Sequence, residues 1–185
     1  MRAALAAHRL AAPRLAAPRL AALALAALGL AAAPALAQEG AELAAAAFVD
    51  QDGNPAGSAQ LVQTPNGVLL TAQVQGLETG GHGFHIHETG SCEPDFQAAG
   101  SHWAPDGRAH GFAVEEGAHK ADLPNIFANN DGFATVHLFL PDLSLEEALA
   151  GDGSALMVHA QPDNYIDVDS AGARVACGAI ETPSD

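Results

Sequence analysis

Residues 68–88 read VLLTAQVQGLETGGHGFHIHE and contain two segments in which apolar and polar side chains alternate. Segments 68–76 and 82–88 both follow this period of two, which is typical of a β-strand with one buried face. The preceding residues 64–67 (TPNG) are a turn signal, because Asn-Gly is strongly favoured in tight hairpins. This stretch therefore predicts antiparallel β-structure.

The chain on both sides of this stretch repeats short apolar segments separated by turns. Residues 50–54 and 129–132 are rich in Asp, Asn and Gly, which favour turns. A helical turn is predicted at 146–150, and long polar loops are predicted at 89–122 and 161–173. This spacing predicts an all-β fold, a Greek-key barrel or sandwich of about eight antiparallel strands with two long functional loops. The remaining predicted strands cover residues 44–49, 57–63, 124–128, 133–140, 155–160 and 174–181.

The first 37 residues contain four arginines and no acidic side chain, unlike the rest of the chain. Their basic part is followed by an apolar run at 20–33 and by the small residues 35–37 (ALA), which is the order of a secretory signal peptide. The alternative, a membrane anchor, is disfavoured because the run is shorter than the about 20 residues of a bilayer span. We therefore interpret residues 1–37 as a signal peptide and residues 38–185 as the mature domain. Export to the periplasm is expected, with full secretion as the alternative.

The acidic side chains are concentrated in the mature domain and exclude several classes of partner. The whole chain has 7 basic and 22 acidic side chains, a net charge of −15. Without the four arginines of residues 1–37, the balance is 3 − 22 = −19. Nucleic acid and anionic membrane surfaces are bound through clustered Lys and Arg, so neither is an expected partner of the mature domain. Its two cysteines, Cys92 and Cys177, predict a disulfide in an exported protein, with two free thiols as the alternative.

Eight of the nine histidines lie in the mature domain and form two candidate metal sites. His85 and His87 are two residues apart in a predicted strand, so both side chains lie on one face. With His159 from another predicted strand, they would form a nitrogen-rich site that suits copper or zinc. Ordinary surface or core histidines are the alternative interpretation. The second cluster offers the three imidazoles and one carboxylate of a closed zinc site, unless it is a polar loop with scattered histidines: His102, His110, His119 and Asp122.

Two motifs resemble the signatures of the copper/zinc superoxide dismutase family. GFHIHETG at 83–90 is similar to the first signature, and AGARVACGAI at 171–180 is similar to the second. The resemblance covers about residues 44–182, nearly all of the mature domain. Four further motifs fall between the signatures in the order of the family: GSH at 100–102, HG at 110–111, HKADL at 119–123 and MVH at 157–159.

The resemblance implies an enzyme that converts superoxide to dioxygen and hydrogen peroxide by cycling Cu(II) and Cu(I), and so protects against exogenous superoxide. One copper and one zinc per subunit are implied, with zinc holding a bridging histidine. The family includes monomers and homodimers, so either state is expected. Two other classes remain open: a catalytically silent metal-binding or copper-delivery domain of the same fold, and an extracellular β-sandwich that uses zinc for stability. A missing copper ligand or arginine would favour the silent domain, and all of them are present here.

The resemblance also implies a role for each matching residue. His102 would bridge the two metals. Arg174, three residues before Cys177, would dock the anionic substrate beside the copper. His82 would support the site without binding metal, and the disulfide from Cys92 would tie the long loop to the last strand. Copper would be held by His85, His87, His102 and His159, and zinc by His102, His110, His119 and Asp122, with Asp163 accepting hydrogen bonds from ligands of both metals.

Overall fold

A computed structural model describes residues 42–183 of the protein. The predicted signal peptide, residues 1–37, lies outside the described residues. The described part contains eight strands, one turn of 3-10 helix (η1, Phe96–Ala99) and one short helix (α1, Leu145–Ala148). The strands are β1 (Leu43–Asp50), β2 (Pro55–Thr64), β3 (Gly67–Val74), β4 (Gly80–His87), β5 (Asp122–Ala128), β6 (Ala134–Leu140), β7 (Ser154–His159) and β8 (Arg174–Ile180).

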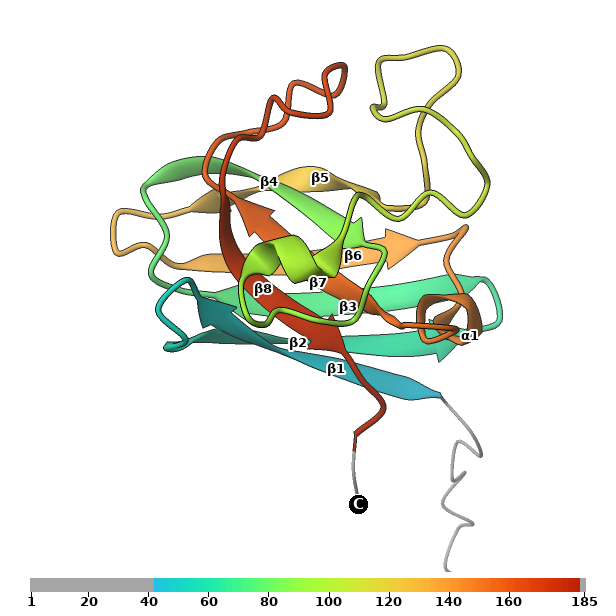
Figure 1. The fold of residues 1–185 in the computed structure, drawn as a ribbon, viewed down its shortest axis with the longest axis horizontal. Coiled ribbons are helices and arrows are strands. Elements are labelled where there is room, and N and C mark those ends of the chain that lie inside the picture. The colour runs from blue at the N-terminus through green and yellow to red at the C-terminus, as the bar shows by residue number, and fades with distance from the viewer. Residues whose placement is uncertain (1–41, 184–185) are drawn as a thin grey trace, which may run out of the picture. The chain divides into compact units, whose positions relative to one another are not determined.

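All eight strands belong to one antiparallel sheet, in the order β5-β4-β7-β8-β1-β2-β3-β6 (Figure 1). The two end strands, β5 and β6, lie close together, so the sheet curls into a nearly closed barrel. The chain crosses the barrel from β3 to β4 and from β6 to β7, and these strands are not neighbours in the sheet. The predicted all-β fold of eight antiparallel strands is therefore confirmed.

The predicted strand boundaries agree with the observed ones to within a few residues, because apolar alternation marks the buried face directly. In β3, alternate side chains from Val68 to Val74 are buried and the side chains between them are exposed. The short helix at 145–148 also matches its prediction. No sequence pattern predicted η1, a four-residue turn that begins where the Asp95 carboxylate accepts a hydrogen bond from the Gln97 N–H, at 2.9 Å.

The strands β4 and β7 are buried on both faces, and this double burial locates the functional site. From His82 onward every side chain of β4 is buried, as is every side chain of β7. Phe84 and Ile86 belong to the main core inside the barrel. Because side chains alternate along a strand, His85 and His87 lie on the outer face, which the long loops cover. Segments 105–121 and 160–173 project from the same side of the barrel, at the top of the view in Figure 1.

The Cys92–Cys177 disulfide connects the loop after β4 to strand β8. Its Cα atoms are 5.8 Å apart and its cysteines are 85 residues apart in the sequence. The chain-entropy model assigns about 4–5 kcal/mol of stabilisation to a loop of this length. The cross-link holds one functional loop against the barrel and confirms the predicted pairing. Within residues 42–183, no helix is long and apolar enough to cross a membrane.

Candidate metal centre

Four imidazoles meet on the outer face of β4 and β7. His85 and His87 come from β4, and His159 ends the neighbouring strand β7, which pairs with β4 in antiparallel register. His102 joins them from the loop, where its backbone forms an isolated bridge with His87. One ring nitrogen of each of the four residues lies within 4.8 Å of the others. These are the four residues for which the sequence predicted a copper site.

A second group of donors surrounds the carboxylate of Asp122 at the start of β5. The distances from Asp122 Oδ1 are 2.8 Å to His110 Nδ1, 3.2 Å to His119 Nδ1 and 4.0 Å to His102 Nδ1. These are the four residues of the predicted zinc site. A ring nitrogen of His85 also lies within 4.8 Å of donor atoms of His102, His110 and Asp122. The ring centroids of His85 and His102 are 4.1 Å apart.

The short distances from Asp122 Oδ1 to His110 and His119 are not hydrogen bonds. Within residues 42–183, seven buried side-chain atoms have no hydrogen-bond partner, and all seven belong to these two groups. An unpaired buried polar atom costs about 1–3 kcal/mol, so their concentration at one place requires a chemical reason. The four imidazoles suit copper, and three imidazoles with a carboxylate suit zinc, so the donor sets fit both metals. The unpaired atoms are Nδ1 of His85, His102, His110 and His119, Nε2 of His87 and His159, and Oδ1 of Asp122.

The second nitrogen of two of these rings is held by a loop carbonyl. His87 Nδ1–H donates to the Gly100 carbonyl at 3.0 Å, and His159 Nδ1–H donates to the Gly172 carbonyl at 3.0 Å. Each bond fixes the tautomer that carries its proton on Nδ1 and leaves the lone pair on Nε2. Both rings therefore present an unprotonated Nε2 to the shared centre.

Asp163 links the two donor groups. Its Oδ2 lies 2.8 Å from His85 Nε2 and 3.2 Å from His110 Nε2. Burial by itself would raise the pKa of Asp163, but hydrogen bonds from the Tyr165 N–H, His85 and other donors outweigh burial and lower it. The ionised carboxylate accepts Nε2–H from both rings, which leaves both Nδ1 lone pairs free.

Burial keeps the imidazoles neutral. Burial is the largest cause that lowers the pKa of His85 to about 4, with His159 also lowering it and Asp163 raising it. Burial is likewise the largest cause that lowers the pKa of His87 to about 3, with Arg174 also lowering it and the hydrogen bond to Gly100 raising it. The pKa of His102 is also lowered, first by burial and then by His85 and His87. A neutral imidazole has the lone pair that a metal requires, whereas an imidazolium has none.

We expect the metal-free protein to lose stability as the pH falls from about 6.5 towards 4, because unfolded histidines have pKa values near 6.5. Between these values the unfolded chain binds more protons than the folded chain, so the free energy of unfolding rises with pH. Urea titrations of chelator-treated protein between pH 7.5 and 4.5 measure this slope. The double variant His85→Gln/His87→Gln should show a shallower slope, and an equal slope would contradict the assignment to these rings.

His82 belongs to neither donor group. Its ring is buried, with Nδ1 2.7 Å from the His159 carbonyl and Nε2 2.8 Å from the Glu78 carbonyl. These contacts hold the backbone at the end of β7. The other remaining histidine, His137, is exposed on β6.

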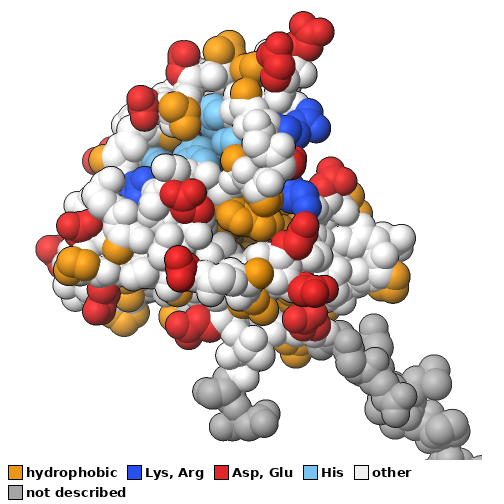
Figure 2. Space-filling model, turned by 45° about the vertical axis from the view of Figure 1, so that its right-hand side comes forward, with side chains coloured by type: hydrophobic (Ala, Val, Ile, Leu, Met, Phe, Trp, Pro, Cys, Tyr) orange, Lys and Arg blue, Asp and Glu red, His pale blue; other side chains and the backbone are white. Residues whose placement is uncertain are grey.

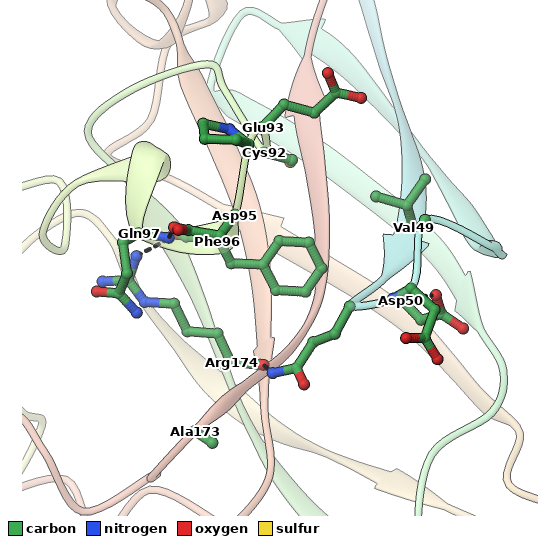
Figure 3. A pocket seen from close by; sticks show the side chains of 13 residues that line it. Val49, Asp50, Cys92, Glu93, Asp95, Phe96, Gln97, Ala173 and Arg174 are labelled. Atoms are coloured by element: carbon green, nitrogen blue, oxygen red, sulfur yellow. Dashed lines mark hydrogen bonds between the residues drawn. The ribbon is translucent and has the colours of Figure 1, made fainter.

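Arg174, at the start of β8, lies beside the four-imidazole group. Its guanidinium donates to the carbonyl oxygens of Phe96 and Gly100. Figure 3 shows the Arg174 side chain reaching past Phe96. Arg174 lines a hollow of about 380 Å³ together with His102 and His159. Burial lowers the pKa of Arg174, which still leaves the guanidinium charged. Gly100 O therefore accepts hydrogen bonds from both the arginine and the His87 ring, and fixes their relative positions.

The face that carries the histidines is mixed in charge near them and acidic elsewhere. In Figure 2 the histidine side chains gather at one place, Lys and Arg side chains lie near them, and Asp and Glu side chains are spread over the visible face. Of the three Lys and Arg side chains in residues 42–183, Arg174 alone lines the hollow beside His102 and His159.

Sequence reasoning missed several groups that hold the site. The carbonyls of Gly100 and Gly172 orient two rings, and backbone groups have no residue-type signature. It also missed Asn125, whose side chain bonds the backbone of Asp163. Its position three residues after Asp122 was the only available signal.

Comparison with known proteins identifies the family. A family model described as copper/zinc superoxide dismutase matches residues 55–180. The chain is 44% identical over 140 residues to a superoxide dismutase [Cu-Zn] of Caulobacter vibrioides, covering 70% of this chain and 80% of the relative. It is 42% identical over 144 residues to that of Photobacterium leiognathi, covering 71% and 82%.

Solved structures agree with this result. The Cu/Zn superoxide dismutase from Brucella abortus has a TM-score of 0.66 and 32% identity, covering 76% of this chain and 100% of that chain. A SOD-like protein from Bacillus subtilis has a TM-score of 0.69 and 34% identity, covering 73% and 96%. The matched residues span the barrel strands β2 to β8 and both donor groups. The chain therefore belongs to the copper/zinc superoxide dismutase family.

Proposed function

We propose that the two adjoining donor groups form the centre at which this chain disproportionates superoxide. Two superoxide anions and two protons give one dioxygen and one hydrogen peroxide. One observation carries the proposal: each of the seven expected ligand residues contributes one of the seven unpaired buried atoms. Membership of the family supports the choice of reaction, and the positions of these atoms support the choice of site.

The donor sets assign the two family cofactors. When bound, copper supplies one-electron redox chemistry, and zinc supplies a fixed positive charge without redox chemistry. His102 belongs to both sets, with Nδ1 on the side of Asp122 and Nε2 left for the other group. We assign copper to His85, His87, His102 and His159, and zinc to His102, His110, His119 and Asp122.

The protein's own contribution is to orient ligands, move a proton and dock the anion. His102 takes up a proton at Nε2 and returns it in each cycle, while Nδ1 stays directed at Asp122. Arg174 docks superoxide beside His102, because two carbonyls fix its guanidinium and its charge is opposite to that of the substrate. Asp163 holds the rings of His85 and His110.

The reaction takes place outside the cytoplasm in this proposal. Residues 1–37 act as the export signal and residues 38–185 as the mature enzyme, with the periplasm as destination. The basic, apolar and small-residue order of the first 37 residues supports this, as does the disulfide, which is stable in an oxidising compartment. The copper-delivery alternative has no observation in its favour, because every copper ligand and the arginine are present.

Metal analysis of residues 38–185 combined with a superoxide-removal assay tests the proposal. We expect one copper and one zinc per chain, and activity that chelation removes and copper restores. A matched control is His137→Gln, which removes a histidine outside both groups and should keep metals and rate. Protein that binds zinc but no copper and stays inactive after copper loading would contradict the enzyme assignment.

A further inference from the structure

The side chain of Asn125 on β5 makes a two-way contact with the backbone of Asp163. Asn125 Nδ2–H donates to the Asp163 carbonyl at 2.9 Å, and the Asp163 N–H donates to Asn125 Oδ1 at 2.9 Å. The carboxamide thus bonds both polar groups of one residue's backbone, as a neighbouring strand would. The contact joins residues that are 38 positions apart in the sequence.

The loop that carries Asp163 has no strand of its own to hold it. Segment 161–173 forms only turns and bends, so the position of Asp163 depends on individual contacts. Within the loop, Asp163 Oδ1 accepts from the Tyr165 N–H at 2.7 Å and from Ser170 Oγ at 2.9 Å. These bonds shape the loop, whereas the bonds from Asn125 attach it to the barrel.

Strand β5 supports this attachment at a second point. The Asn125 N–H donates to the Tyr165 hydroxyl at 2.8 Å. The Tyr165 ring packs against Phe112 of the other loop, with centroids 5.2 Å apart. The same strand begins at Asp122, which pairs in register with His85 on β4. One strand therefore presents a predicted zinc ligand and the anchor of the loop that bears Asp163.

We propose that Asn125 is a positioning residue for both metals. Its carboxamide sets the place of the Asp163 carboxylate, which lies 2.8 Å from His85 Nε2 and 3.2 Å from His110 Nε2. Each of these rings has its unpaired Nδ1 on the opposite side, so a shift of Asp163 turns both donors. The inference rests on the proposed function, because it acts through the role assigned to Asp163.

The effect on the two metals should be similar in size. Loss of an outer partner of a ligand histidine typically lowers metal affinity about 10–100-fold. Asn125 acts one step further away, so the lower end of that range, about 10-fold, is expected for its removal. Because Asp163 serves one ring from each donor group, the change must appear in copper and zinc together.

The test measures the release of copper and zinc from the loaded mature protein into excess chelator. Asn125→Leu removes both carboxamide bonds at nearly constant size, and Asn125→Asp keeps the acceptor but places an oxygen against the Asp163 carbonyl. We expect both variants to release both metals about 10-fold faster. Asn66→Leu and Asn66→Asp are matched controls in the β2–β3 turn and should release metals at the unaltered rate. Should Asn125→Leu fail to fold, Asn125→Asp supports the same comparison.

Repeating the Asn125→Leu substitution in Asp163→Ala protein shows whether Asn125 acts through Asp163 or through the general stability of the fold. In Asp163→Ala protein the carboxylate is absent, so adding Asn125→Leu should not speed release further. Equal acceleration in both backgrounds, acceleration of one metal alone, or no acceleration would overturn the inference. If Asp163→Ala releases metals fast while Asn125→Leu does not, the role of Asp163 stands and only this inference fails. If Asp163→Ala itself has no effect, the assigned role of Asp163 fails and the inference fails with it.

Discussion

The His102→Ala variant should lose copper and zinc affinity together and be nearly inactive. His102 is assigned to both metals, and its Nδ1, one of the unpaired buried atoms, lies 4.0 Å from Asp122 Oδ1. Removing a direct ligand should weaken each metal by more than the about 100-fold seen when outer partners are lost. Titration of each metal against a competing chelator, followed by a superoxide-removal assay, measures both effects.

The comparison with other histidines makes this result specific. His119→Ala should weaken zinc strongly and copper little, because His119 lies near Asp122 and in no group with His87 or His159. His137→Ala removes an exposed histidine on β6 and should change neither. If His102→Ala affected a single metal, His102 would not be shared and the bridge would be wrong.

The fold could be predicted because most strands bury one face. Alternation in segment 68–76 placed β3, and the turn at 64–67 placed the hairpin before it. The histidine pair of 82–88 was predicted for the same reason, since the strand period puts His85 and His87 on one side. The loop ligands were different, because no local pattern places His102 or Asp122 in space. Their residue types and closeness in the sequence suggested a zinc site, but the role of His102 as a shared ligand came only from the resemblance. The structure brings the donor atoms of His102 and Asp122 to 4.0 Å.

What the sequence could not predict depends on contacts between distant backbone groups. Gly100 O holds the His87 ring and Arg174 at once, but a carbonyl is present in every residue and carries no signal. The bonds from Asn125 to Asp163 likewise depend on how the loop folds back over β5. The ligand residues could therefore be predicted from this sequence. The backbone carbonyls and the Asn125 side chain that orient them could be identified only in the folded structure.

The Arg174→Ala variant should keep both metals and lose most of its rate at low superoxide concentration. Arg174 is in neither donor group, so metal content should not change. Its guanidinium lines the hollow beside His102 and His159, where it presents a positive charge to an anion on an otherwise acidic domain. A charge-assisted contact is worth roughly 1.5–3 kcal/mol, so kcat/KM should fall about 10–100-fold. Pulse-radiolysis rates with metal analysis of the same samples measure both quantities.

Two further variants separate local docking from the loss of one positive charge. Arg108→Gln makes the same change in net charge in the loop at 105–121, where Arg108 donates to the Gly117 carbonyl, and should leave the rate nearly unaltered. Arg174→Lys keeps a charge but cannot bond both carbonyls in the planar geometry of a guanidinium, so its rate should lie between wild type and alanine. At about 0.15 M salt the Debye length is about 8 Å, which screens distant acidic groups from the hollow but not a docked pair. The deficit of Arg174→Ala should therefore persist at physiological salt, and its disappearance there would show that Arg174 acts only through long-range attraction.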